Sequence, residues 1–116
     1  MLKVDLDYIY NISDNDRDFI KEMLTTFVKI TPGSVDGINN AFETKNWKEI
    51  GRIAHKIKPS ILLLGIDEFS NMVRELEYIT KNEIDMDSIS VKISLLNKYS
   101  LEALADIDDL LSTGRY

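Results

Sequence analysis

The only histidine of the chain, His55, lies three residues before Lys58 in the stretch IAHKIKPSILLLGI, residues 53–66. Neutral imidazole has a free lone pair near neutral pH, so His55 can act as a nucleophile. A lysine about one helical turn away can stabilise negatively charged oxygens as a point charge. The alternatives are a surface histidine without a chemical role and a solvated lysine. The choice depends on how the helix around these residues is oriented.

Other kinds of chemistry have little support in the sequence. The chain contains no cysteine, which excludes disulfides and thiolate metal sites. Asp106, Asp108 and Asp109 form an acidic cluster, which on a helix is interpreted as a solvated face. Glu75 and Glu77 are interpreted in the same way. No glycine-rich nucleotide loop is present. We therefore expect no metal site, no cofactor and no ATP-dependent kinase activity.

Apolar residues recur at helical spacing along most of the chain, and no segment alternates as a strand would. Pro32 and Gly33 interrupt the longest pattern, so we expect a kink or a brief break there. An acidic loop is expected over residues 83–87 and a frayed tail over residues 112–116. The expected helices cover about residues 6–10, 14–44, 47–64, 68–82 and 88–111.

Capping residues support these boundaries. Two pairs have the spacing of a capping box, Ser13 with Asp16 and Asn46 with Glu49. Gly65 can close the segment 47–64, and Asp67 can cap the helix that follows.

Four long amphipathic helices with short links favour an antiparallel four-helix bundle. The predicted fold is all-α, with a short extra N-terminal helix, and residues 1–116 suit one domain. No second large apolar face requires a dimer, so we expect a monomer.

The charge and hydropathy of the chain limit the kinds of partner that we expect. A net charge of −6 argues against nucleic acid, because phosphate binding needs clustered Lys and Arg. No apolar run approaches the roughly 20 residues that a membrane span needs. The first residues, MLKVDLDYIY, are too acidic and too poor in apolar residues for a signal peptide. We therefore expect a cytoplasmic protein that binds neither membranes nor nucleic acid.

A helical wheel places His55 opposite the apolar stripe of its own helix. That stripe consists of Ile50, Ile53, Ile57, Ile61 and Leu64. On the outward side, Leu62 lies about 20° from His55, and Lys58 and Arg52 lie about 60° from it. Lys56 is about 100° away. We therefore expect His55 to point towards solvent or a partner.

Two further residues are unusual on an exposed helix face. Gly51 costs about 1 kcal/mol of helix stability relative to alanine, which is easier to understand if another backbone comes close. Pro59 removes its own N–H and crowds the carbonyl of His55, at a cost of about 3 kcal/mol. It can bend the helix there or free that carbonyl to accept another hydrogen bond.

The stretch AHKIKPSILLLGI resembles the signature of histidine-containing phosphotransfer (Hpt) domains. The family pattern has a histidine, a lysine three residues on and a glycine ten residues on, which here are His55, Lys58 and Gly65. Length, acidity and helix order fit as well, so the resemblance covers most of the chain. The departures are Pro59, where the family usually has glycine, and the apolar run 61–63, which makes the docking face more apolar than usual.

The resemblance implies a phosphorelay intermediate. His55 would accept a phosphoryl group from a receiver-domain aspartate and pass it to another receiver aspartate, while Lys58 stabilises the phosphoryl oxygens. The receiver domain, of a response regulator or a hybrid histidine kinase, would supply Mg²⁺. The expected docking residues around His55 are Gly51, Arg52, Lys56, Pro59, Leu62 and Gly65.

Two other functions stay open. A non-catalytic helical adaptor would bind a receiver or another protein through the face of His55 and Leu62. A plain structural bundle would use that face for nothing. In the leading interpretation the chain is a phosphocarrier rather than an autonomous enzyme.

Overall fold

Residues 2–116 fold into helices, as the spacing of the apolar residues predicts. The computed structural model describes these residues, and they contain no strand. The elements in chain order are α1 (Asp7–Ile12), α2 (Arg17–Glu43), α3 (Trp47–Leu63), α4 (Asp67–Asn82), the 3-10 turn η1 (Met86–Ser88) and α5 (Ile89–Thr113). The prediction of four long helices and a short extra N-terminal helix is confirmed.

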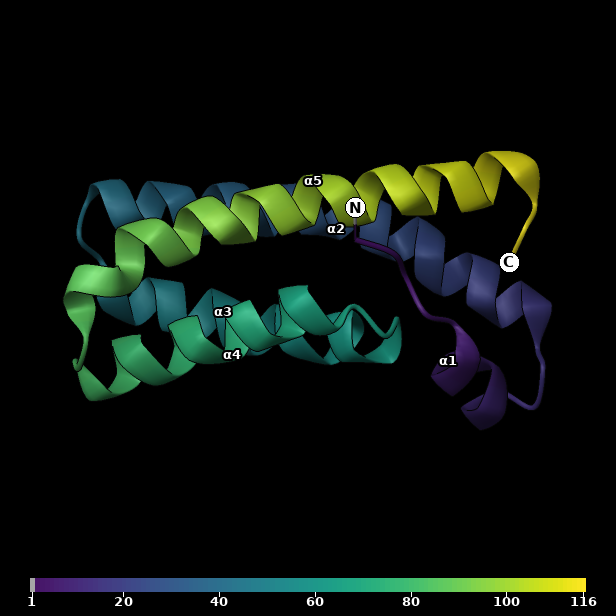
Figure 1. Cartoon of the computed structure of the whole chain (residues 1–116), viewed down its shortest axis with the longest axis horizontal. Helices are drawn as coiled ribbons and strands as arrows, with labels where there is room; N and C mark the ends of the chain where they lie inside the picture. Colours follow the sequence, from purple (N-terminus) through teal and green to yellow (C-terminus); the bar gives the residue numbers. More distant parts are fainter. Residues whose placement is uncertain (1) are drawn as a thin grey trace.

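The four long helices pack together as a bundle (Figure 1). α3 and α4 form a hairpin. α2 packs on α3, α5 packs on α4, and α2 and α5 pack on each other. α2 and α5 extend beyond the hairpin at one end, where α1 lies beside α2 (Figure 1). The hairpin therefore presents one side to α2 and α5 and the other side to solvent. Among residues 2–116, no helix is long and apolar enough to cross a membrane.

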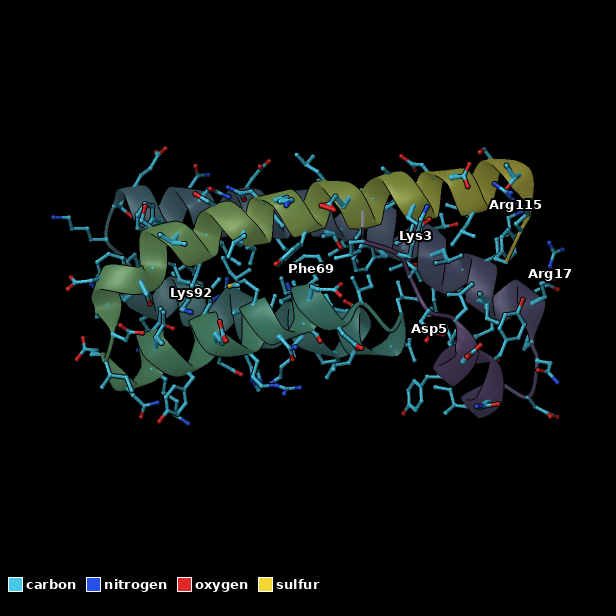
Figure 2. All side chains as sticks on the ribbon, in the orientation of Figure 1. Lys3, Asp5, Arg17, Phe69, Lys92 and Arg115 are labelled. Carbon is cyan, nitrogen blue, oxygen red and sulfur yellow. The ribbon has the colours of Figure 1, made fainter. Side chains whose placement is uncertain are left out.

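The core lies where the apolar stripes of the helices meet. The stripe predicted for the helix of His55 is buried along its whole length, from Ile50 to Leu64. Phe27 of α2 and Phe69 of α4 pack edge to face, with their ring centroids 6.4 Å apart. Phe69 lies between the hairpin and the α2–α5 pair in Figure 2. Burial of this stripe fixes the rotation of α3 and with it the direction of His55.

Both ends of α3 have the predicted capping residues. The side chain of Asn46 accepts a hydrogen bond from the backbone N–H of Glu49, at 3.2 Å. Gly65 follows the helix with φ +63°, and its N–H donates to the Leu62 carbonyl at 3.1 Å. Because these signals are local, the sequence predicts the limits of α3 well.

Two predicted caps are wrong. Asp16 caps α2, by accepting from the N–H of Phe19 at 3.0 Å, whereas Ser13 lies before the helix and accepts from the N–H of Asp16. Asp67 is the first residue of α4, and the cap position belongs to Ile66. Ile66 is fully buried, so core packing rather than a polar cap fixes this boundary.

Pro32 does not break α2, which is continuous through Pro32 and Gly33. The neighbouring residues Thr31 and Val35 are buried in the bundle, whereas Pro32 is exposed. The packing on both sides of the proline compensates for the one backbone hydrogen bond that it removes. The expected brief break is therefore wrong, and the kink, which was the other expectation, stays a prediction.

The expected frayed tail is also wrong, because the C-terminus is held against the start of α2. α5 continues to Thr113, and Nε of Arg17 donates to the carbonyl of Tyr116 at 2.9 Å. The guanidinium carbon lies 4.4 Å from the centre of the Tyr116 ring. Arg17 lies at this end of the molecule in Figure 2.

The N-terminal segment crosses the bundle from α5 to the turn after α3. The N–H of Val4 donates to Oδ2 of Asp106 at 2.8 Å, and Nζ of Lys3 lies 3.3 Å from Oδ1. The N–H of Asp5 donates to the carbonyl of Leu64 at 3.1 Å. Figure 2 shows Lys3 and Asp5 along this path. Asp106 is buried, so its interpretation as part of a solvated face is wrong.

Candidate functional site

His55 projects from the outward face of α3. Its side chain is 73% exposed, while the preceding residue, Ala54, is fully buried. Ile53 and Ile57 on the opposite face anchor this turn of the helix in the core. The direction of His55 predicted from the helical wheel is therefore confirmed.

Glu77 of α4 is the carboxylate that binds both His55 and Lys58. One oxygen, Oε2, makes a hydrogen bond with Nδ1 of His55. The other, Oε1, accepts from Nζ of Lys58 at 2.7 Å. The side chains of Lys58 and Glu77 are 25% and 20% exposed, so both are much less accessible than the imidazole. The three side chains form the His55–Lys58–Glu77 cluster.

The cluster favours an ionised Glu77. The hydrogen bond from Lys58 lowers the pKa of the Glu77 carboxyl, and the hydrogen bond with His55 lowers it further. Partial burial raises this pKa, with an effect smaller than that of the Lys58 hydrogen bond but larger than that of the His55 hydrogen bond, and the net shift is downward. Near neutral pH the cluster therefore contains a carboxylate next to the imidazole.

This arrangement directs the chemistry of the imidazole to one nitrogen. An Nδ1–H that donates to Glu77 leaves the lone pair on Nε2. Nε2 lies on the far side of the ring from Glu77, and the side chain as a whole is open to solvent. A carboxylate at Nδ1 also stabilises positive charge on the ring. The cluster can therefore present an oriented nucleophile to an electrophile that arrives from outside.

The interpretation of Glu77 as a solvated residue is wrong. The sequence carries a weak signal, because Glu77 follows Val73 by four residues and so lies at the edge of the α4 apolar stripe. Glu75, three residues after Met72, lies at the opposite edge of the same stripe, where it is exposed and pairs with Lys92 of α5 at 3.0 Å. Only the packing of α4 on α3 brings Glu77 to His55.

Four of the predicted docking residues are exposed around His55. They are Arg52, Lys56, Pro59 and Leu62, which we call the docking surface. Leu62 is 43% exposed, and Arg52 makes an ion pair with Glu49, whose pKa this interaction lowers. Lys56 lies beside a shallow groove between α2 and α3 that Ile30 also lines. The docking surface is therefore basic towards the start of α3 and apolar towards its end.

The structure gives the two glycines roles inside the fold. A Cβ at Gly51 would lie 2.8 Å from the hydroxyl oxygen of Thr80, so Gly51 allows α4 to approach α3. A Cβ at Gly65 would lie 2.9 Å from Cβ of Asp5, because the N-terminal segment covers this turn. Gly65 also has the positive φ that favours glycine. Helix packing and chain reversal account for both residues without a partner.

Pro59 leaves α3 continuous from Trp47 to Leu63. Its side chain is exposed, one turn beyond His55 on the same side of the helix. The helix is thus maintained, and the proline adds a rigid apolar ring to the docking surface.

The described part of the chain shows no cluster of potential metal ligands. Within residues 2–116, no group of three or more His, Cys, Asp or Glu side chains is placed to hold a metal ion. Asp109, from the acidic cluster of α5, pairs instead with Arg115 at 2.8 Å.

A comparison with protein-family models identifies the family. The model of the Hpt domain matches residues 22–112, which include the whole His55–Lys58–Glu77 cluster. The chain belongs to the Hpt domain family. Membership implies a phosphotransfer role in a phosphorelay, and Hpt domains typically interact with receiver domains. No curated protein and no solved structure matches the chain. The resemblance inferred from the motif is confirmed.

Proposed function

We propose that His55 of this Hpt domain accepts a phosphoryl group from an aspartyl phosphate of one receiver domain and passes it to an aspartate of another. The single observation that supports this most is the hydrogen bond between Nδ1 of His55 and Glu77, next to an otherwise exposed imidazole. A histidine held in this way has an oriented ring, and its Nε2 is open to a partner.

The transfer step uses the lone pair of Nε2. This nitrogen attacks the phosphorus, an N–P bond forms, and the P–O bond to the receiver aspartate breaks. The electron pair of that bond leaves with the aspartate carboxylate. The proton on Nδ1 stays in place, and Glu77 stabilises the positive charge that develops on the ring. The reverse sequence returns the phosphoryl group to a second receiver aspartate.

Lys58 stabilises the phosphoryl oxygens after a small movement. Its ammonium is 2.7 Å from Oε1 of Glu77, one turn from His55. A phosphoryl group on Nε2 brings additional negative charge to this region, and the flexible lysine side chain can turn towards it. Glu77 thus holds the ammonium of Lys58 close to His55. The lysine side chain therefore needs to move only a short distance when the phosphoryl group is transferred.

The receiver would bind on the docking surface and supply Mg²⁺. Leu62 and Pro59 offer it apolar contacts on one side of His55, and Arg52 and Lys56 offer positive charge on the other. Buried apolar contacts contribute affinity, whereas charges at the rim mainly accelerate association. Such a surface suits a receiver with an apolar patch and an acidic edge.

The test is incubation of the protein with a phosphorylated receiver from the same source. We expect label that is labile to acid and stable to alkali, and we expect His55→Gln to abolish it. Circular dichroism of the variant provides the control for folding. If the wild-type protein binds the receiver but takes up no label, the adaptor function replaces the phosphocarrier function. If the His55→Gln variant keeps its label, His55 is not the acceptor.

A further inference from the structure

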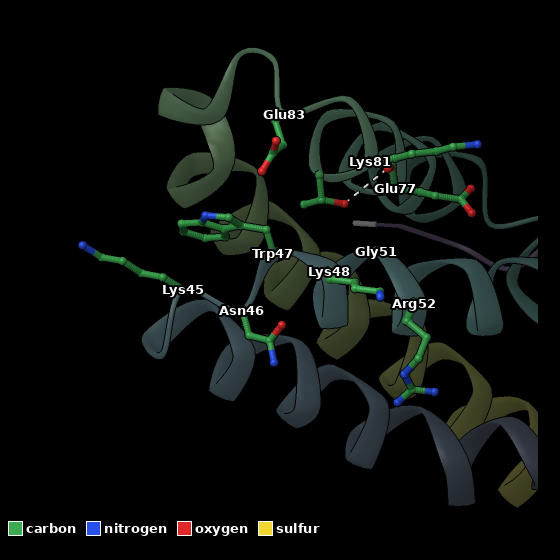
Figure 3. A pocket seen from close by; sticks show the side chains of 10 residues that line it. Lys45, Asn46, Trp47, Lys48, Gly51, Arg52, Glu77, Lys81 and Glu83 are labelled. Carbon is green, nitrogen blue, oxygen red and sulfur yellow. Dashed lines mark hydrogen bonds between the residues drawn. The ribbon is translucent and has the colours of Figure 1, made fainter.

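A hollow of about 640 Å³ lies between the first half of α3 and the last half of α4. Figure 3 shows the indole of Trp47 at one end, below Glu83, and Glu77 towards the other end. Gly51 and Thr80 lie between them and form the floor where α3 and α4 approach most closely. The volume falls within the range of about 300–1,000 Å³ that is usual for small-molecule sites.

Basic side chains outnumber acidic ones in the lining of the hollow, although the chain as a whole is acidic. Four basic side chains line it, against the carboxylates of Glu77 and Glu83, whereas the chain has a net charge of −6. Among residues 2–116, no carboxylate forms an ion pair with Lys45, Lys48 or Lys81. Lys45 points away from the hollow in Figure 3 and Arg52 pairs with Glu49, so Lys48 and Lys81 are the cations available to an occupant.

Trp47 provides an apolar surface in the same place. It is half-buried, and its ring packs at a tilt on Phe42, with the centroids 6.2 Å apart. This contact fixes the indole, while part of it still lines the hollow. A rigid aromatic wall at one end and unpaired cations along the groove suit a ligand with a planar group and an anionic group.

We propose that this hollow binds a small planar anion of the nucleoside-phosphate class and that its occupancy slows phosphoryl transfer to His55. The link is Glu77, which lines the hollow and also binds His55 and Lys58. An anion beside Glu77 adds negative charge next to the site where the phosphoryl group arrives, and it competes for the nearby cations. The regulatory effect rests on the proposed function of His55, but binding of the ligand does not.

The test of binding uses the only tryptophan of the chain as its probe. Titration of the full chain with ADP, without any receiver, should change the Trp47 fluorescence saturably. Lys48→Ala and Lys81→Ala should each weaken binding about tenfold, as expected for loss of a charged hydrogen-bond partner. Lys98→Ala, an exposed lysine of α5 outside the hollow, should bind as the wild type does.

Separate titrations with adenosine and with inorganic phosphate measure how strongly each part of the ligand binds alone. Each should bind more weakly than ADP. No fluorescence change with ADP at millimolar concentration, or a change that both lysine variants retain, would overturn the site. Equal affinity for ADP and inorganic phosphate would show that the planar group contributes nothing to binding, which would contradict that part of the proposal. If the lysine variants weaken only the binding of a receiver, the hollow is a protein contact and not a small-molecule site.

The test of regulation compares transfer rates with and without ADP. Transfer to His55 should slow several-fold at saturating ADP in the wild type, and Lys48→Ala should need about tenfold more ADP for the same effect. Adenosine at the same concentration controls for nonspecific effects. An unchanged rate with ADP bound would overturn the coupling through Glu77. Absence of transfer without ADP would instead overturn the proposed function.

Discussion

Glu77 and Asp106 are two carboxylates in similar surroundings with different consequences. Each is largely withdrawn from solvent, and each binds one lysine and one further nitrogen. For Asp106 that nitrogen is the backbone N–H of Val4, so the contact fastens the N-terminal segment. For Glu77 it is Nδ1 of His55, whose ring has a second nitrogen open to solvent. The same local chemistry thus stabilises the fold in one place and prepares a nucleophile in the other.

The comparison predicts its largest effect for Glu77→Gln. The amide can still accept a hydrogen bond from Nδ1, but it lacks the charge that stabilises the ring cation. We expect the single-turnover rate of transfer to His55 to fall about 10–100-fold, as for other groups that orient a functional histidine. Rapid-quench kinetics with a phosphorylated receiver provides the measurement. Glu75→Gln is the matched control on the same helix, and an equal loss in both variants would refute the role of Glu77.

Asp106→Ala should show the opposite pattern. Removal of the carboxylate leaves the N–H of Val4 without its acceptor and Lys3 without its partner, which should cost about 1–3 kcal/mol of unfolding free energy. Urea unfolding measures this loss, with the exposed Asp108→Ala as the control. The transfer rate should not change. If Asp106→Ala slowed transfer as much as Glu77→Gln does, the two regions would not be separable.

Lys58→Ala is expected to act on transfer more than on stability. Loss of one charged hydrogen-bond donor to the phosphoryl oxygens corresponds to a roughly tenfold slower transfer. The helical circular dichroism should be preserved, because Lys58 lies outside the core. Lys98→Ala provides a control for loss of a positive charge. A rate equal to that of the wild type would refute the role given to Lys58.

The smallest effect concerns pH. The pKa of Glu77 is below 4.5 in the folded protein, chiefly because of Lys58, so the ionised carboxylate adds stability above about pH 4.5. This contribution should disappear as the pH falls from 4.5 through the lowered pKa. The free-energy difference between the wild type and Glu77→Gln should therefore be at most about 1 kcal/mol at pH 6 and should decrease steadily as the pH falls below about 4.5. Urea unfolding of both proteins across this range tests the sign, and a difference that grew on acidification would contradict it.

The sequence predicts what depends on neighbouring residues. The limits of α3 follow from Asn46 and Gly65, and the outward direction of His55 follows from the stripe of isoleucines on the same helix. Helical periodicity determines which side of a helix is buried, and it needs no knowledge of other helices. For this reason the fold class and the exposure of His55 were accessible before the structure.

The parts that the sequence did not predict depend on contacts between distant segments. Glu77 reaches His55 across the α3–α4 interface, and Thr80 explains Gly51 across the same interface. The N-terminal segment binds α5 through Asp106, about a hundred residues further along the chain. The rotation and register of one helix against another set these contacts, and they follow from side-chain packing over the whole core rather than from spacing along one helix.

The most direct test of the central claim is the position of the phosphoryl group on the imidazole ring. After transfer from a receiver, heteronuclear NMR of the ring nitrogens should place the phosphorus on Nε2 of His55, with Nδ1 still protonated. Phosphorus on Nδ1, or a phosphoryl group on any other residue, would contradict an account in which Glu77 holds Nδ1 and leaves Nε2 as the nucleophile.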